Sequence, residues 1–152
     1  MRLTTICYIE QDGNYLMLHR TKKENDQSHD KWLGVGGKFE KDESPDECIL
    51  REVKEESGAN GEIIKYVGKT QYTFKGSEDT VNKTVHWYLM SANSFYCKPQ
   101  SEEYFADAGF YKFHEAYHLL KFNDERQILK KAYYEYSEMR KNKEFLRRKF
   151  GE

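Results

Sequence analysis

Residues 36–59, which read GGKFEKDESPDECILREVKEESGA, limit the possible folds and chemistry of this chain more strongly than any other segment. Glu52, Glu55 and Glu56 follow one another at i, i+3 and i+4, so a helix places all three on one face. Like charges on one helical face repel, and a soluble fold either scatters them or supplies a cation. A glycine-rich turn at residues 34–37 precedes them. The pattern predicts a divalent-metal site for phosphate chemistry.

The helix that carries these acids has clear start and stop signals. Ser44 can cap its amino end, Pro45 fits the first helical position, and Glu47 completes a capping box. Gly58 is expected in the left-handed conformation that ends many helices. The sequence therefore predicts a helix from residue 44 to about residue 57. Three residues on this helix can face the core: Cys48, Ile49 and Val53.

The other apolar runs predict a mixture of strands and helices. Strands are expected over residues 4–9, 15–19, 62–67, 69–74, 83–90 and 110–113. Helices are expected over residues 115–120 and about 123–150, the last with an apolar stripe at helical spacing. Residues 20–31 form a polar run without periodicity, which predicts a surface loop. Residues 91–109 are expected to be irregular.

Composition narrows the class of protein. A chain of 152 residues is expected to form one domain over residues 1–152, and its net charge of -1 does not favour nucleic-acid or membrane partners. The six basic residues between Arg140 and Lys149 are interpreted as the charged end of a packed helix rather than a nucleic-acid-binding tail. Cys7, Cys48 and Cys97 are widely spaced, which predicts free thiols. With no apolar run of membrane-spanning length, the expected location is cytoplasmic.

At this point the sequence resembles a known family, the Nudix hydrolases. The family's signature over residues 37–59 is matched at each fixed polar and glycine position: Gly37, Glu43, Arg51, Glu52, Glu55, Glu56 and Gly58. The one departure is Ala59, which is smaller than the usual closing aliphatic residue. The resemblance implies a single Nudix domain, with a final helix over about 123–150. It also implies an α/β/α sandwich with a mixed central β-sheet.

The resemblance assigns roles to the residues of the signature. Glu52, Glu55 and Glu56 are expected to be catalytic and to bind Mg²⁺, with Mn²⁺ as a substitute, together with the Gly36 carbonyl. The resemblance gives a structural role to four residues: Gly37, Glu43, Arg51 and Gly58. A later carboxylate often joins such a site, and Glu102 or Glu103 could supply it, although a surface position is an equal alternative. The general base is one of these acids and is not fixed further.

Substrate recognition is less defined. Residues 16–20 and 31–38 resemble the MutT-like branch, the 8-oxo-dGTP diphosphatases. The candidate substrate-binding residues are Trp32, Leu33, Lys38, Asn123 and Asp124. Some members of the branch have a purine-reading asparagine at the position of Leu33, and a leucine cannot make those hydrogen bonds. Asn123 could instead cap the last helix, and Trp32 could belong to the core.

The function expected from the resemblance is Mg²⁺-dependent hydrolysis of a nucleoside triphosphate to the monophosphate and pyrophosphate. An oxidised purine nucleotide such as 8-oxo-dGTP is the expected substrate. A different nucleoside diphosphate derivative, such as ADP-ribose or a nucleotide sugar, is one alternative, and a non-catalytic nucleotide-binding regulator is another. The expected partner is a small nucleotide, with no nucleic acid and no membrane, and the protein could be a monomer or a homodimer.

Overall fold

The computed structural model describes residues 2–20, 31–58, 61–92 and 105–150 of the chain. These residues form seven strands and three helices. In chain order they are β1 (Arg2–Gln11), β2 (Asn14–Arg20), β3 (Lys31–Leu33), β4 (Val35–Lys38), α1 (Pro45–Ser57), β5 (Gly61–Lys75), β6 (Thr80–Ala92), β7 (Phe105–Lys112), α2 (Phe113–Leu119) and α3 (Asn123–Phe150).

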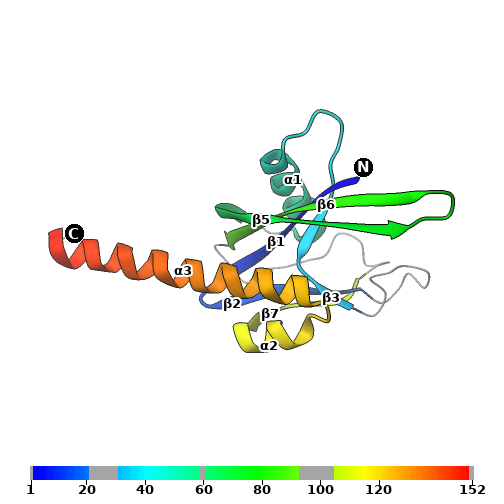
Figure 1. Cartoon of the computed structure of the whole chain (residues 1–152). Coiled ribbons are helices and arrows are strands. Elements are labelled where there is room, and N and C mark those ends of the chain that lie inside the picture. Colours follow the sequence, from blue (N-terminus) through cyan, green and yellow to red (C-terminus); the bar gives the residue numbers. More distant parts are fainter. Residues whose placement is uncertain (1, 21–30, 59–60, 93–104, 151–152) are drawn as a thin grey trace.

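The seven strands belong to one mixed sheet with β1 near its middle. β1 pairs in parallel with β6 along one edge, while its other edge pairs with β2 beside the hairpin and with β4 farther along. β5 pairs antiparallel with β6, and β2 pairs antiparallel with β3 and β7. Because β4 lies directly against β1, the glycine-rich segment is held near the centre of the sheet (Figure 1).

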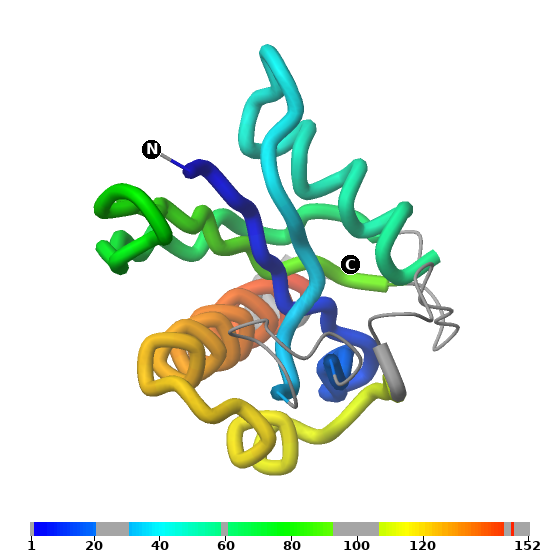
Figure 2. The backbone as a smooth tube through the Cα atoms, turned by 90° about the vertical axis from the view of Figure 1, so that its right-hand side faces the viewer, coloured from blue at the N-terminus to red at the C-terminus, as the bar shows by residue number. Residues whose placement is uncertain are grey.

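Helices cover both faces of this sheet. Figure 2 shows α1 on one side of the strands, with α2 and α3 on the other side. Under α1, Ile49 and Val53 pack in a buried cluster with Ile9, and on the opposite face Leu129 and Ala132 of α3 pack in a second cluster. Each fully buried large apolar side chain contributes about 1.5–3 kcal/mol to folding. The three-layer arrangement confirms the predicted α/β/α sandwich with a mixed central sheet.

The glycine-rich turn expected at residues 34–37 is instead largely the strand β4, which pairs with β1. Two predicted strand boundaries are also wrong. Residues 62–67 and 69–74 belong to one strand, β5, and not to two. Gly68 does not interrupt it, because the ladder with β6 absorbs the irregularity as register shifts beside Ile63 and Tyr66. β7 begins at Phe105, within the segment expected to be irregular, because pairing with the buried strand β2 orders it. Tertiary pairing decides both cases, and a local pattern does not report it.

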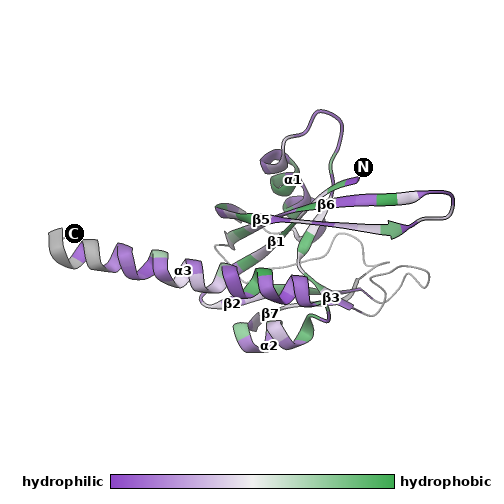
Figure 3. Ribbon diagram, in the orientation of Figure 1, coloured by the Kyte–Doolittle hydropathy of each residue, from purple (hydrophilic) through white to green (hydrophobic). Residues whose placement is uncertain are grey.

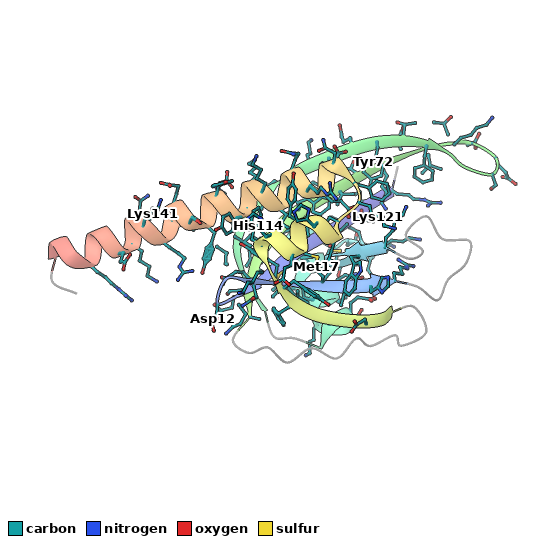
Figure 4. All side chains as sticks on the ribbon, turned by 90° about the horizontal axis from the view of Figure 1, so that it is seen from below. Asp12, Met17, Tyr72, His114, Lys121 and Lys141 are labelled. Carbon is teal, nitrogen blue, oxygen red and sulfur yellow. The ribbon has the colours of Figure 1, made fainter. Side chains whose placement is uncertain are left out.

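The carboxyl-terminal half of α3 extends beyond the sheet. Figure 1 shows this helix projecting well past the strands, and Figure 4 places Lys141 on the projecting part. The hydropathy colouring of Figure 3 shows that this part is mainly hydrophilic. Within the described ranges, no helix has both the length and the apolar character needed to cross a bilayer.

Candidate metal centre

Helix α1 begins and ends where the sequence predicts. The Glu47 backbone N–H donates to Ser44 Oγ at 3.2 Å, and the Ser44 N–H donates to Glu47 Oε1 at 3.2 Å, which completes the capping box. At the other end Gly58 adopts φ 70°, a left-handed conformation that glycine takes without a steric penalty. The Tyr88 hydroxyl donates to the Asp46 carboxylate, which ties the first turn to β6. The helix is therefore fixed at both ends.

The absence of a side chain at Gly37 creates the space for one of the three acids. A Cβ atom at position 37 would overlap the carboxylate group of Glu52, which packs directly against β4. Glu52 is only 7% exposed, an unusual degree of burial for a glutamate. Gly37 is itself held by its pairing with Thr5 of β1. The glycine and the acid, fifteen positions apart in the sequence, thus form one close contact at the centre of the sheet.

Arg51 fastens the segment before α1 to the helix. Its Nε donates to Glu43 Oε2 at 2.6 Å and its Nη2 donates to Glu43 Oε1 at 3.0 Å, a bidentate pair. The same Nη2 donates to the Lys38 carbonyl oxygen at 2.9 Å. The hydrogen bonds from Arg51 lower the pKa of Glu43 to about 2, and Glu43 in turn raises the pKa of Arg51. Both groups therefore stay charged throughout the neutral range.

The remaining edge of the Arg51 guanidinium faces the other acids. Nη1 lies 2.8 Å from Glu52 Oε1 and 3.0 Å from Glu55 Oε2, and 3.5 Å from Glu40 Oε1. Burial raises the pKa of Glu52 and of Glu56, and in each case neighbouring carboxylates raise it further. The negative charges of these neighbouring carboxylates therefore favour a nearby cation, and Arg51 supplies part of that positive charge.

The donor set fits a hard divalent cation. Mg²⁺ and Mn²⁺ prefer carboxylate and carbonyl oxygens, and residues 36, 52, 55 and 56 offer those groups. In the described part of the chain, no three acidic, imidazole or thiol side chains converge on one point in the present side-chain arrangement. In this arrangement Arg51 Nη1 binds one oxygen of Glu52 and one oxygen of Glu55.

A second group of polar and aromatic side chains gathers where α3 begins. We call it the α3-start cluster; it consists of Lys31, Tyr72, Phe122, Asp124 and Glu125. Lys31 Nζ lies 4.3 Å from the centre of the Phe122 ring. Burial raises the pKa of Glu125 to about 7. Burial also raises the pKa of Tyr72, and the negative charges of Glu125 and Asp124 raise it further. The contact between Lys31 and Phe122 brings β3 to the start of α3, and Tyr72 of β5, labelled in Figure 4, is close enough to feel the charges of Asp124 and Glu125.

The proposed substrate-binding residues occupy different environments. Trp32 stacks on His19 with ring centres 4.5 Å apart and meets Tyr111 edge-on. Leu33 is half-buried and pairs with Leu18 of β2. Three others expose their side chains: Lys38, Asn123 and Asp124. The structure thus brings only Asp124 into the α3-start cluster.

Several predicted residues lie outside the described ranges. They are Ala59, Cys97, Glu102 and Glu103. The other two cysteines, Cys7 and Cys48, are buried free thiols.

Sequence reasoning missed Glu125 and the contacts of Arg51 with the acids of its own helix. A signal for Glu125 was present, because Glu125, Leu129 and Ala132 share one helical face and the latter two are fully buried. An acid on a core-facing stripe indicates a carboxyl group that is shielded from water. A signal for Arg51 was its i, i+4 spacing to Glu55.

Comparison with known proteins adds family information to this geometry. The family model described as the NUDIX domain matches residues 1–133. CTP pyrophosphohydrolase of Escherichia coli is 31% identical over 96 residues, which cover 63% of this chain and 65% of that protein. YtkD of Bacillus subtilis, named as a proposed 8-oxo-dGTP diphosphatase, is 44% identical over 52 residues, which cover 34% of this chain. The matched part is 32% of YtkD, so the chain spans from about a third to two thirds of these relatives' lengths.

A solved structure shares the fold. The MutT NUDIX hydrolase from Burkholderia pseudomallei superimposes with a TM-score of 0.68, covering 86% of this chain and 96% of that one. The two sequences are 20% identical, so this likeness concerns the fold alone. The family match, by contrast, includes the complete segment from the glycine-rich strand to the end of α1. The chain belongs to the Nudix family.

Proposed function

We propose that this protein hydrolyses a nucleoside triphosphate, with Mg²⁺, to the nucleoside monophosphate and pyrophosphate. The observation that carries the proposal is the packing of the Glu52 carboxylate against Gly37 of β4, beside two further glutamates of α1. Arg51 supplies one positive charge against the negative charges of Glu43, Glu52 and Glu55, so a further cation would complete the balance. Mn²⁺ is proposed as a substitute for Mg²⁺.

Glu52, Glu55, Glu56 and the Gly36 carbonyl are proposed to hold the ion, and Glu102 or Glu103 could add a further ligand. When bound, such an ion neutralises phosphate oxygens and promotes ionisation of a coordinated water. The group that accepts the proton of the attacking water is proposed to be one of these three glutamates or the later carboxylate. Arg51 and Glu43 keep the segment before α1 in place while Gly37 leaves room for Glu52.

The favoured substrate is an oxidised purine nucleotide such as 8-oxo-dGTP. The name of YtkD, the relative with 44% identity over the matched segment, supports this choice. Trp32, Leu33, Lys38, Asn123 and Asp124 are proposed to contact the nucleotide. Residues 31–38 connect these positions to the acids, since β3 ends at Leu33 and β4 begins at Val35.

CTP is the second candidate substrate. The relative named CTP pyrophosphohydrolase matches 63% of this chain, more than YtkD does. Leu33 is compatible with either base because it offers no hydrogen bond.

A substrate panel with Mg²⁺ tests the proposal. The panel contains 8-oxo-dGTP, the four dNTPs, CTP, ADP-ribose and a nucleotide sugar, and the products are separated by ion-exchange chromatography. We expect fastest turnover of 8-oxo-dGTP, with release of pyrophosphate. Turnover of ADP-ribose alone would show that the substrate is another nucleoside diphosphate derivative and not a nucleoside triphosphate. Binding without turnover of any compound would favour the non-catalytic regulator.

A further inference from the structure

The guanidinium of Arg51 has two edges with different partners. The edge formed by Nε and Nη2 is taken by Glu43 and by the Lys38 carbonyl, at distances of 2.6–3.0 Å. The third nitrogen, Nη1, is taken by Glu52 at 2.8 Å and Glu55 at 3.0 Å. One edge therefore anchors the side chain, and the other lies among the acids proposed to hold the metal.

Nη1 also lies 3.5 Å from Glu40, but it hydrogen-bonds only Glu52 and Glu55, and it holds these two acids unequally. The side chain of Glu52 is 9% exposed and is confined by Gly37, whereas the side chain of Glu55 is 48% exposed. Exposed ion pairs at i, i+4 contribute little to stability, and solvent and salt screen them. Of the two hydrogen bonds, the one between Arg51 and Glu55 is therefore the easier to exchange.

The Glu55 carboxylate shares its negative charge with Arg51 Nη1, which makes it a weaker ligand for another cation. Nη1 binds Glu52 and Glu55 at the same time, so one positive charge already lies against both carboxylates. A divalent ion needs negatively charged oxygen ligands, so its arrival and the Nη1 contacts draw on the same groups. Arg51 also places a positive charge next to the site, which repels an incoming cation.

We propose that Arg51 is a positioning residue that serves as the resident counter-ion of the metal centre and releases Glu55 when a divalent cation binds. In the metal-free protein Arg51 balances the charge of Glu52 and Glu55. On metal binding Glu55 exchanges Nη1 for the ion, while the bidentate pair with Glu43 persists. Arg51 thereby stabilises the metal-free protein, and by the same contacts it lowers the affinity of the centre for a divalent cation. This inference rests on the proposed function, since it needs the metal centre described above.

The first experiment measures Mg²⁺ affinity by calorimetry, with Mg²⁺ alone and no nucleotide. We expect Arg51→Gln to bind Mg²⁺ roughly three- to tenfold more tightly than the wild type, because a competitor and a repelling charge are gone. Lys54→Gln is the matched control, since Lys54 is an exposed cation three residues farther along the same helix. We expect it to change the affinity by less than about twofold, because exposed charges are screened at physiological salt.

The outcomes separate the inference from the proposed function. A wild-type protein that binds no Mg²⁺ overturns the proposed metal centre and with it the inference. A wild type that binds Mg²⁺ while Arg51→Gln binds it equally or more weakly overturns the inference only. That second result is what a purely structural role predicts, because a loosened α1 start would weaken the site.

The second experiment avoids the substitution, in case Arg51→Gln does not fold. Nitrogen-15 NMR of the wild-type arginine side chains is recorded during a Mg²⁺ titration. We expect the Arg51 Nη1 signal to shift or to lose its protection from exchange with water, while the Nε signal, held by Glu43, changes little. An unchanged Nη1 signal at saturating Mg²⁺ contradicts the exchange of Glu55.

Discussion

The acid-bearing region of α1 and β4 differs from the α3-start cluster in how its residues are brought together. The first comes from one continuous segment, residues 36–58, with contacts inside that segment, to the neighbouring strand β1 and, through Asp46, to Tyr88 of β6. The second combines β3, β5 and α3, which are separated by up to about ninety positions in the sequence. One region is encoded locally, and the other exists only after the sheet and α3 have packed.

This difference matches the division of labour in the proposed function. Hydrolysis of a phosphoric anhydride needs the same ligands whatever base is attached, so a short segment can carry it unchanged. Recognition of a base depends on side chains from several elements, each free to vary without affecting the ligands. The region around α1 should therefore control the rate of the chemical step, and the α3-start cluster should control which nucleotide binds.

The largest expected effect concerns the acids of α1. We expect Glu55→Gln to lower kcat by roughly a thousandfold, because the neutral amide is a poor ligand for Mg²⁺. Steady-state assays with the best substrate of the panel measure it. Glu78→Gln, an exposed glutamate in the turn between β5 and β6, is the control and should keep the wild-type kcat. Equal kcat values for Glu55→Gln and wild type would remove Glu55 from the centre.

The next effect tests the contact between Gly37 and Glu52. We expect Gly37→Ala to lower the free energy of unfolding by about 1–3 kcal/mol, because the new methyl group overlaps the Glu52 carboxylate. Glu52→Ala removes the overlapping group, so the double variant should be less destabilised than the sum of the single variants. Denaturant titrations of the four proteins measure this cycle. Strict additivity would mean that the two residues do not touch in solution.

Most of the α1 region could be predicted from the sequence because its signals are local. The capping box at Ser44, the left-handed Gly58 and the acids at i, i+3 and i+4 depend on backbone geometry within a few residues. The spacing of these residues also identifies the family, whose fold then follows. The close approach of Glu52 to Gly37 follows less directly, since it requires β4 to pair with β1.

The bounds of β5 and β7 and the burial of Glu125 could not be predicted, because each depends on packing against residues far away in the sequence. β5 continues through Gly68 because thirteen residues of β6 stabilise the ladder around it. Phe105 enters β7 because β2 offers an edge for pairing. Burial at the start of α3 is the largest cause that raises the pKa of Glu125 to about 7, and that burial exists only once α3 packs on the sheet.

A smaller effect concerns Glu125 of the α3-start cluster, whose contribution to stability depends on pH. Its folded pKa of about 7 exceeds the ordinary glutamate value, so the folded state keeps a proton that the unfolded state has lost. The wild type should therefore become less stable as the pH rises from about 5 to about 8. Its free energy of unfolding should fall by about 2 kcal/mol more than that of Glu125→Gln, which has no carboxyl group to titrate. The charged or titratable groups around it are Lys31, Asp124, Tyr8 and Tyr72.

Denaturant titrations at several pH values measure the difference for Glu125. A difference that does not change with pH would show that the carboxyl group ionises as it does in the unfolded chain.

The α3-start cluster predicts a separation of KM from kcat. Tyr72 is 40% exposed, so its ring is accessible to a base, and stacking of a base on an aromatic ring contributes about 1–3 kcal/mol. We expect Tyr72→Ala to raise KM roughly tenfold with kcat within about twofold, because the metal ligands are untouched. Tyr134→Ala, an exposed tyrosine on α3, is the control. A fall in kcat without a change in KM would contradict the division between the two regions.

The smallest effect tests whether the α1 region works as one unit. Ser44→Ala removes the oxygen that accepts the Glu47 N–H and should lower the free energy of unfolding by about 1 kcal/mol. The kcat should stay within about twofold of wild type, because Arg51 still ties residues 38 and 43 to the helix and Gly37 still receives Glu52. Ser77→Ala, in the exposed turn after β5, is the matched control. A large loss of kcat in Ser44→Ala would mean that the helix start, and not the Arg51 contacts, sets the position of the acids.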